Sequence, residues 1–389
     1  MRDFIYHAPT KVYFGKDKHK EVGAIIKGYG FNTIMMQYGK GSIKKNGLYD
    51  EVMKSLTENG IKVVEMEGVE PNPKLSFVRE AVKVAEENNV QMILAVGGGS
   101  VIDSSKYTAI GAVNDFDVWD IFEKGAAPKA GLPVASILTL AAAGSEMSGN
   151  AVVTNMEQNM KRGYGCDYFR CLFSILNPEL TYTVNKYQTA CGIVDIMMHT
   201  LERYHTPCEA TDLTDRIAEG ILKAVVDAGK VAIEKPDDYE ARATIMWASS
   251  LSHNNLTGCG RDNALAVHQL EHALSGEYDE VAHGAGLAVL YPAWCKYVYK
   301  ENIPRFAQIA RRVWDVTETD DEKAALMGIN KMADYFTSIG MPSKISDFNI
   351  PEDSIDRMAE LCTFGKSRSI GGYIPLDYEK VKEVFKMAF

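Results

Sequence analysis

Three of the eight histidines of this 389-residue chain lie within the stretch HQLEHALSGEYDEVAH, residues 268–283. The run ALAVHQLEHAL around its first half is rich in Ala and Leu and contains no Pro or Gly, which predicts a helix over 264–275. On that helix His268 and His272 stand one turn apart on the same face. Imidazoles brought together in this way are common ligands of divalent transition metals.

A second pair of candidate ligands lies upstream in GIVDIMMHTLERY, where Asp195 and His199 have the same i, i+4 spacing on a predicted helix over 186–204. A carboxylate and imidazoles from two or three helical segments can close on one divalent cation. A single pair at this spacing is more often an ordinary contact on a helix face. Two pairs together with His283 leave a metal site and ordinary helix contacts equally good interpretations of these residues alone.

The letters HQLEH also match the H-x-x-E-H pattern of inverted zinc proteases, in which both histidines bind zinc and the glutamate activates water. Under this interpretation His268 and His272 are ligands and Glu271 is the base. The pattern is short and occurs often by chance. A zinc hydrolase is therefore the second functional hypothesis for the chain.

A glycine-rich turn, QMILAVGGGSVIDSSK over residues 91–106, is the other chemically informative stretch. A buried strand, three glycines and a helix bring backbone N–H groups and a positive helix end close to a pyrophosphate, because glycine has no Cβ to obstruct the approach. The stretch is neither GxGxxG nor a P-loop, and a tight turn with a cap formed by Ser100 and Asp103 is the structural alternative. The candidate cofactor-binding residues here are Gly97, Gly98, Gly99, Ser100 and Asp103.

A second turn, QYGKGSIKKNG over residues 37–47, follows the predicted strand NTIMMQYG. In dinucleotide sites an acidic residue after this strand holds the 2′-hydroxyl of NAD, and its absence leaves room for the 2′-phosphate of NADP. We expect NADP(H) in preference to NAD(H), with a solvated lysine loop as the alternative. The candidate residues are Gly39, Lys40, Gly41 and Ser42.

The composition restricts the partners of the chain. A net charge of -10 disfavours non-specific binding to nucleic acid or to anionic membranes. The longest small apolar stretch, AGLPVASILTLAAAG, is interrupted by Pro133 and is too short to span a bilayer. Seven cysteines without a CxxC arrangement, and an N-terminus without an apolar signal region, indicate a cytoplasmic protein with reduced core thiols.

Predicted strands alternate with predicted helices in the first half of the chain, after an expected β-hairpin over 3–14. This alternation predicts a Rossmann-like parallel sheet with helices on both faces. We expect an α/β dinucleotide-binding domain over 1–182 and an all-helical metal-binding domain over 183–389. The predicted helices include 16–29, 47–59, 74–88, 100–112, 186–204, 212–234, 238–252, 264–275 and 286–300.

Together these features resemble the metal-dependent, iron-containing (group III) alcohol dehydrogenases, most closely the NADPH-dependent butanol dehydrogenase branch. The likeness covers nearly the whole chain and includes PTKVYFGK, YGKGSIKKNGLYD, GVEPNP, GGGSVIDSSK, PVASILTL, GSEM, DIMMH, DDYEARATIMWASS, HQLEH and AHGAGLA in the same order. It implies an α/β N-terminal domain, an all-α C-terminal domain and a cleft between them, in the dehydroquinate synthase-like architecture. It also implies a homodimer.

The resemblance further implies roles for individual residues. His272 stands near the substrate rather than on the metal, which disfavours the hydrolase hypothesis. Relatives commonly read TTAGTGSE where this chain reads TLAAAGSE, so a catalytically inactive nucleotide- and metal-binding protein is a third hypothesis. The implied metal ligands are Asp195, His199, His268 and His283. The further implied cofactor contacts are Thr139, Leu140, Ser145 and Lys161.

The expected reaction is hydride transfer between NADP(H) and a primary alcohol or aldehyde such as butanol or butyraldehyde. One carboxylate and three neutral imidazoles suit Fe(II) or Zn(II) and leave one position open for the substrate oxygen. His272 is expected to relay the proton. Of the other histidines, His253 is a candidate to contact a ligand, His205 is expected to point elsewhere, and His7 and His19 are expected on the surface.

Overall fold

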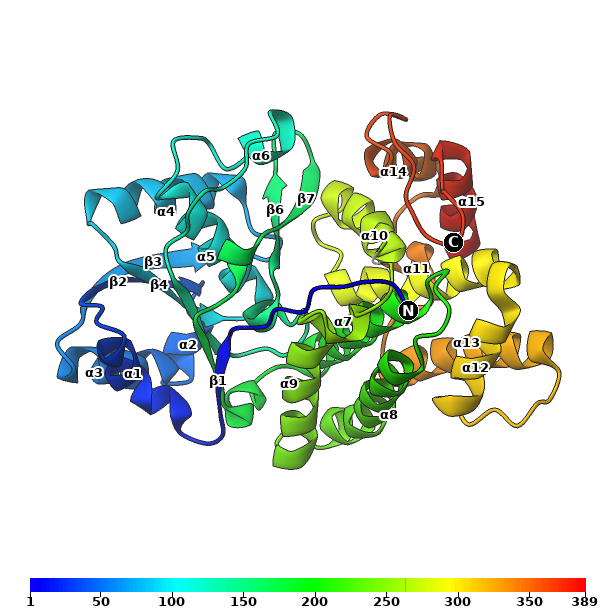
Figure 1. Ribbon diagram of the computed structural model, residues 1–389, viewed down its shortest axis with the longest axis horizontal. Coiled ribbons are helices and arrows are strands. Elements are labelled where there is room, and N and C mark those ends of the chain that lie inside the picture. The colour runs from blue at the N-terminus through cyan, green and yellow to red at the C-terminus, as the bar shows by residue number, and fades with distance from the viewer. Residues whose placement is uncertain (263) are drawn as a thin grey trace. The chain divides into compact units, whose positions relative to one another are not determined.

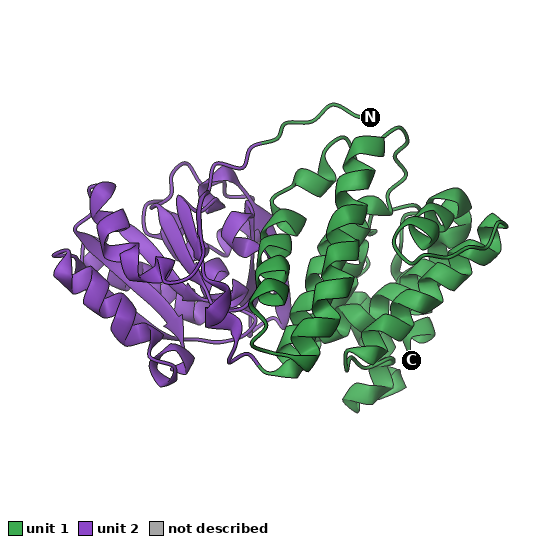
Figure 2. Ribbon diagram, turned by 90° about the horizontal axis from the view of Figure 1, so that it is seen from below, with its two compact units in different colours: residues 1–6, 185–389 green, residues 7–184 purple. Residues whose placement is uncertain are grey.

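The computed structural model describes residues 1–262 and 264–389. The chain forms two compact units, coloured separately in Figure 2. Residues 7–184 form the first, called here the α/β unit, and residues 185–389 together with 1–6 form the second, called the helical unit. The helical unit begins at Asn185, close to the predicted change of character after residue 182.

The α/β unit is built on a six-stranded sheet in the order β1-β8-β5-β4-β2-β3, and all its neighbouring strands run parallel (Figure 1). The predicted parallel α/β fold is thereby confirmed. The strands are β1 (Lys11–Phe14), β2 (Thr33–Gly39), β3 (Lys62–Val69), β4 (Met92–Gly97), β5 (Val134–Leu138) and β8 (Phe173–Leu176).

Helices cover both faces of this sheet, because its central strands are apolar on both sides. On one face, α1 (Val22–Gly28) and α3 (Leu48–Glu58) pack in one core with alternate residues of β2, including Ile34 and Met36. Gln37, the residue after Met36, points to the other face, where its amide donates to Thr108 of α5 (Gly99–Gly111) at 3.0 Å. Also on that side, α4 (Leu75–Glu87) packs with α5.

Two expectations for the α/β unit are wrong, and one hairpin was not predicted. The predicted hairpin over 3–14 is absent: only Lys11–Phe14 is a strand, and it pairs parallel with β8. Instead, an antiparallel hairpin of β6 (Asn150–Asn155) and β7 (Met160–Gly165) was missed. His19 is buried rather than on the surface, because its ring bonds to the Glu51 carboxylate at 2.6 Å.

The helical unit follows the predicted pattern closely. Its first two helices, α7 (Lys186–Tyr204) and α8 (Asp212–Glu234), have the predicted ends. The next three differ by a few residues, since helix ends fray and caps decide the boundary. They are α9 (Tyr239–His253), α10 (Ala266–Glu277) and α11 (His283–Val298). The remaining long helices are α12 (Ile303–Arg312), α13 (Asp321–Ser338), α14 (Ile355–Cys362) and α15 (Tyr378–Ala388).

All seven cysteines are free thiols and six of them are buried, which confirms the expectation of reduced core thiols. Within the described ranges, no helix is both long enough and apolar enough to cross a membrane.

A buried charge network ties the C-terminal end of α7 to its neighbours. Asp215 on α8 forms ion pairs with the guanidinium groups of Arg261 and Arg305 and accepts from the Thr211 hydroxyl at 2.8 Å. The Arg305 side chain also donates to the backbone oxygen of Tyr204, the last residue of α7, at 2.9 Å. One carboxylate is therefore the shared ionic partner of two guanidinium groups that are almost inaccessible to solvent.

Asp215→Ala is expected to destabilise the protein by about 3–5 kcal/mol, because it leaves two buried guanidinium groups without their counter-charge. The free energy of unfolding from urea denaturation measures the effect. Asp227→Ala, an exposed change on the same helix, is the control and is expected to stay within about 0.5 kcal/mol of the unmodified chain. Equal losses in the two variants would contradict the prediction.

Candidate metal centre and cofactor turn

Helices α7, α10 and α11 bring the predicted metal ligands together. Asp195 Oδ1 lies 3.1 Å from His199 Nδ1, 3.5 Å from His268 Nε2 and 3.9 Å from His283 Nε2. His283 is the first residue of α11 and reaches α7 because Gly284 permits close approach: a Cβ there would lie 2.1 Å from the backbone oxygen of Cys191. One ring nitrogen of each of the three histidines thus lies within 3.9 Å of the same carboxylate oxygen, Asp195 Oδ1.

These residues fit a metal ion. Around a tetrahedral ion with ligand bonds of about 2.1 Å, neighbouring donor atoms lie about 3.4 Å apart, close to the separations found here. Asp195 Oδ1, His199 Nδ1 and His268 Nε2 are buried and have no hydrogen-bond partner within residues 1–262 and 264–389. Buried polar atoms normally have hydrogen-bond partners. A cation bound between these three converging atoms would take the place of such partners.

Electrostatics agree with this assignment. Burial lowers the pKa of the His199 imidazole to about 3, so its nitrogen lone pair is available at neutral pH. Burial would raise the pKa of Asp195, but the surrounding imidazoles hold it well below its usual value. For His268, burial is outweighed by the Glu202 and Asp195 carboxylates, which raise the pKa to about 9. A cation binding here would displace that proton.

Two buried carboxylates stand behind the histidines. Glu202 Oε2 accepts from His268 Nδ1, and Glu271 Oε2 accepts from His283 Nδ1. In each ring the Nε2 atom therefore faces Asp195 while Nδ1 is held from outside.

In the α/β unit, the glycine turn joins β4 to α5. The helix begins at Gly99 with Gly98 as its N-cap, so the proposed cap of Ser100 with Asp103 is wrong. The loop after β5 lies over this turn: a Cβ on Gly98 would be 3.3 Å from Leu140 Cβ, and one on Gly99 would be 3.4 Å from Ala143 Cβ. A side chain at Gly98 would press on Leu140, whereas one at Gly99 would only touch Ala143, so the loop packs closely on the turn.

The two predicted cofactor turns lie at the same edge of the sheet, because β2 and β4 are parallel neighbours. From β2 the chain passes to α3 on one face, and from β4 it passes to α5 on the other. Parallel sheets bind ligands outside the carboxyl ends of strands where the chain reverses its direction of travel. The topology thus supports a nucleotide at these turns.

The turn after β2 differs in part from the expectation of free lysines. Gly41, with φ +106, caps the short helix α2 (Ser42–Lys45). Lys40 forms an ion pair with Glu70, and Lys44 forms one with Glu67 at 2.6 Å. Ser42 and Lys45 are exposed. Two of the three lysines therefore already have carboxylate partners.

The other predicted cofactor residues are placed as follows. Thr139 donates its backbone N–H to Gly97 at 3.0 Å, beside the glycine turn. Ser145 and Asp103 are buried and bonded to each other, and Asp103 also accepts from the backbone of Val152 at 2.9 Å. Lys161 is buried on β7 opposite Thr154. Contact of these side chains with the cofactor stays a prediction.

Comparison with known proteins decides the family. The family model of the iron-containing alcohol dehydrogenases matches residues 9–178, and the model of the C-terminal region of that family matches residues 189–389. The chain belongs to the iron-containing alcohol dehydrogenase family. The NADH-dependent butanol dehydrogenase A of Clostridium acetobutylicum is 44% identical over 391 residues, with 100% of both chains covered.

Two further relatives of this iron-containing alcohol dehydrogenase bear on fold and cofactor. The crystal structure of NADH-dependent butanol dehydrogenase A from Thermotoga maritima has a TM-score of 0.97 at 40% identity, covering 100% of this chain and 99% of that one. The NADPH-dependent aldehyde reductase YqhD of Escherichia coli is 34% identical over 358 residues, covering 91% of each chain. The resemblance inferred from the sequence is confirmed, and similar proteins are named for either nicotinamide cofactor.

The zinc hydrolase hypothesis is wrong for this alcohol dehydrogenase, and the local geometry shows why. Glu271 is completely buried and bonded to His283, so it is not placed to activate water. The rings of His268 and His272 are 6.5 Å apart between centroids and nearly perpendicular. Potential ligand atoms form two close groups. His268 belongs to the group with Asp195 and His199, whereas His272 belongs to the group with Glu271 and His283.

Sequence reasoning missed Glu202 entirely and misassigned Glu271. A signal for Glu202 was present, since it lies one turn after His199 on the same face of α7. His253, a candidate for contact with a ligand, packs its ring 3.8 Å from that of His199 between centroids. His205 bonds to the Tyr291 hydroxyl at 2.6 Å, away from the ligands, as expected.

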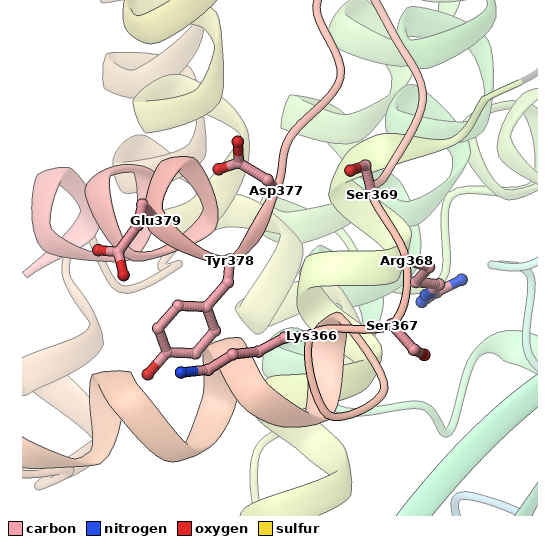
Figure 3. Close-up of a pocket in the computed structure, with 7 residues that line it drawn as sticks. All are labelled: Lys366, Ser367, Arg368, Ser369, Asp377, Tyr378 and Glu379. Carbon is pink, nitrogen blue, oxygen red and sulfur yellow. The ribbon is translucent and has the colours of Figure 1, made fainter.

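A polar hollow of 460 Å³ lies elsewhere in the helical unit, where the loop after α14 meets the start of α15 (Figure 3). Its charges are mixed, and Lys366 lies 4.0 Å from the centre of the Tyr378 ring. Arg368 in its wall donates to the Gln269 side chain of α10 at 2.9 Å. The hollow thus borders a junction that secures the helix carrying His268 and His272.

Proposed function

We propose that this iron-containing alcohol dehydrogenase transfers a hydride between NADP(H) and a primary alcohol or aldehyde such as butanol or butyraldehyde, with Fe(II) or Zn(II) at Asp195, His199, His268 and His283. The observation that carries the proposal is the convergence of three imidazole nitrogens on Asp195 Oδ1 within 3.9 Å. The names of the similar butanol dehydrogenases support the substrate class.

In this proposal, residues of the helical unit hold the metal and move the proton, and residues of the α/β unit hold the nicotinamide cofactor. When bound, the divalent cation supplies a Lewis acid that polarises the C–O group of the substrate. Asp195 and the three histidines fix its position, and His272, half-buried beside them, accepts the hydroxyl proton in oxidation and returns it in reduction. The turns after β2 and β4 would hold a nicotinamide cofactor, which would supply the acceptor or donor of the hydride. The α/β unit thus acts as dinucleotide-binding domain and the helical unit as metal-binding domain.

Absorbance of the reduced nicotinamide tests the proposal. The metal-stripped protein is mixed with NADPH and butyraldehyde, alone and after addition of Fe(II) or Zn(II). Oxidation of NADPH that depends on added metal is expected. Binding of both metal and NADPH without turnover of butyraldehyde or other primary aldehydes would instead support the inactive nucleotide- and metal-binding protein.

The preference for NADP(H) rests on the turn after β2. It offers no carboxylate at Gly39, and the exposed Ser42 hydroxyl and Lys45 ammonium group suit a 2′-phosphate. No partner for Lys45 is found within the described part of the chain, whereas Lys40 and Lys44 are held by acids. Those two ion pairs, and the NADH-dependent relatives, favour NAD(H) as the second candidate.

Gly39→Asp is expected to raise the KM for NADPH by roughly one to two orders of magnitude, because a carboxylate repels a 2′-phosphate and forfeits charge-assisted contacts of about 1.5–3 kcal/mol each. NADH kinetics should be unchanged or improved. Side-by-side kcat/KM values for both cofactors measure this. Equal kcat/KM values for NADH and NADPH in the unmodified protein would rule out the preference, whatever the variant does.

We also infer a homodimer in the cytoplasm. The N-terminal segment leaves Phe4 and Ile5 exposed at 52% and 88%, and β1 is an edge strand of the sheet. Exposed apolar side chains and unpaired strand edges favour association. Light scattering that gives the mass of a monomer would contradict this inference.

A further inference from the structure

We infer that Glu202 and Glu271 are positioning residues of the metal centre, each holding one ligand histidine from behind. The inference rests on the proposed metal site and extends it to two side chains to which neither the sequence pattern nor the comparisons give this role. Both carboxylates come from helices that also carry ligands, and both bond across to a histidine on another element: Glu202 from α7 to His268, and Glu271 from α10 to His283.

Glu202 performs two tasks at once. Its Oε2 atom accepts from His268 Nδ1, and its two oxygens also accept from the backbone N–H groups of Val267 and His268. Those N–H groups belong to the first turn of α10, where no intrahelical partner exists. The N-cap residue, Leu265, has φ +44 and provides no side-chain cap. Glu202 therefore both caps α10 and fixes the ring that α10 carries.

Glu271 has a narrower task. Its side chain is fully buried, and it reaches His283 at the start of α11. Room for it comes from Gly286: a Cβ at that position would lie 2.9 Å from Glu271 Cγ and 3.2 Å from Glu271 Oε1. The glycine is one helical turn after His283, so the same helix start carries the ligand and the space for the carboxylate behind it.

The consequence for the metal follows from the imidazole itself. A neutral ring with its proton on Nδ1 presents its lone pair on Nε2, the atom that faces Asp195 in both histidines. A carboxylate bonded to that proton fixes the tautomer, prevents ring rotation and makes Nε2 a stronger donor. Together with Asp195, the two glutamates place three buried carboxylates around one divalent cation. The surplus of negative charge favours retention of the ion.

Glu271 provides the cleaner test because it caps no helix. In Glu271→Leu the acceptor is lost, whereas in Glu271→Gln an amide oxygen still accepts from Nδ1–H without the charge. The protein is loaded with Co(II), and loss of the ion to a chelator is followed together with its visible absorption spectrum. We expect the Leu variant to release Co(II) roughly 10–100-fold faster with an altered spectrum, and the Gln variant to lie between it and the unmodified protein.

Glu277→Gln is the matched control, since this glutamate ends the same helix and pairs with Arg357 at 3.4 Å, away from the ligands. Gly286→Ala is a second, independent perturbation, expected to speed release because the added methyl group displaces Glu271. If Glu271→Leu lowers thermal stability but releases Co(II) at the unmodified rate with an unchanged spectrum, the bond only ties α10 to α11 and the inference is overturned.

The readouts separate this inference from the proposed function. Neither chelation rate nor absorption spectrum requires an alcohol or a nicotinamide. An unmodified protein that holds Co(II) tightly but oxidises no alcohol would refute the dehydrogenase and leave the role of Glu271 intact. If the unmodified protein is an active dehydrogenase but its Glu271→Leu variant keeps its metal, the role of Glu271 is refuted and the proposed function stands.

Discussion

His283→Ala is expected to yield a protein without bound metal whose turnover is lower by roughly three orders of magnitude, since a Lewis acid supplies several kcal/mol of transition-state stabilisation and about 1.4 kcal/mol corresponds to a factor of ten. Asp195→Ala, His199→Ala and His268→Ala should behave alike. Metal content by elemental analysis and NADPH oxidation with butyraldehyde measure the two effects.

Among the four proposed ligands, His283 is the most informative to change. Its Nε2 atom is the furthest from Asp195 Oδ1, at 3.9 Å, and its side chain is 25% exposed whereas the other three are buried. Ligand atoms of Asp195, His199 and His268 all lie within 4.8 Å of one another, and His283 does not belong to this group. If three ligands sufficed, His283→Ala would retain metal, and full metal content in that variant would contradict the assignment.

Binding of NADPH provides the control for this experiment. The proposed cofactor turns follow β2 and β4 in the α/β unit, whereas all four ligands lie in the helical unit. Fluorescence titration with NADPH should therefore give the same affinity in His283→Ala as in the unmodified protein. Loss of both metal and NADPH binding would indicate a misfolded variant, and His283→Asn would then replace Ala as the test.

The convergence of the candidate ligands was predictable in part because helix periodicity carries information over short distances. Asp195 and His199 share one face of α7, and the boundaries of that helix were predicted correctly from the sequence. The spacing also placed His268 and His272 on one face of α10, but it could not say which of them is a ligand. That distinction depends on the crossing of helices, which Gly284 permits and which no local pattern encodes.

The outer carboxylates were not predictable for the same reason. Glu202 and His268 are separated by 66 residues in the chain, and their contact depends on how α7 and α10 pack. Glu271 was misassigned because it lies in a short motif, and a motif specifies residue types without specifying what each side chain faces. The structure gives Glu271 a histidine as partner, and this excludes the role of base that the motif suggested.

In the α/β unit, the central strands were predicted because they are continuous apolar runs bounded by turns. The prediction of an N-terminal hairpin was wrong because alternation of residue types does not identify the partner strand. In the structure β1 pairs with β8, far along the chain. Asp103 shows the same limit at the level of one side chain. Its position in the glycine turn suggested the cofactor or a cap, yet its carboxylate is directed to Ser145 and to the backbone of Val152.

His272→Ala is expected to keep its metal while kcat falls by roughly a hundredfold or more, which is the usual contribution of a positioned acid–base group. The reason is its location: the ring is half-buried, 5.7 Å between centroids from His283 and 6.5 Å from His268, and it is not in the group of atoms around Asp195. It is close enough to exchange a proton with a substrate at the metal without occupying a ligand position.

Metal content and kcat measured on the same preparations of His272→Ala decide the question, with His7→Ala as control because that imidazole is exposed and lies outside the helical unit. Added imidazole should restore part of the lost rate if the missing group moves a proton, because a small base can enter the space that the side chain leaves. Loss of metal from His272→Ala would show that His272 is a ligand. Full metal content with an unchanged kcat would show that protons reach solvent without it.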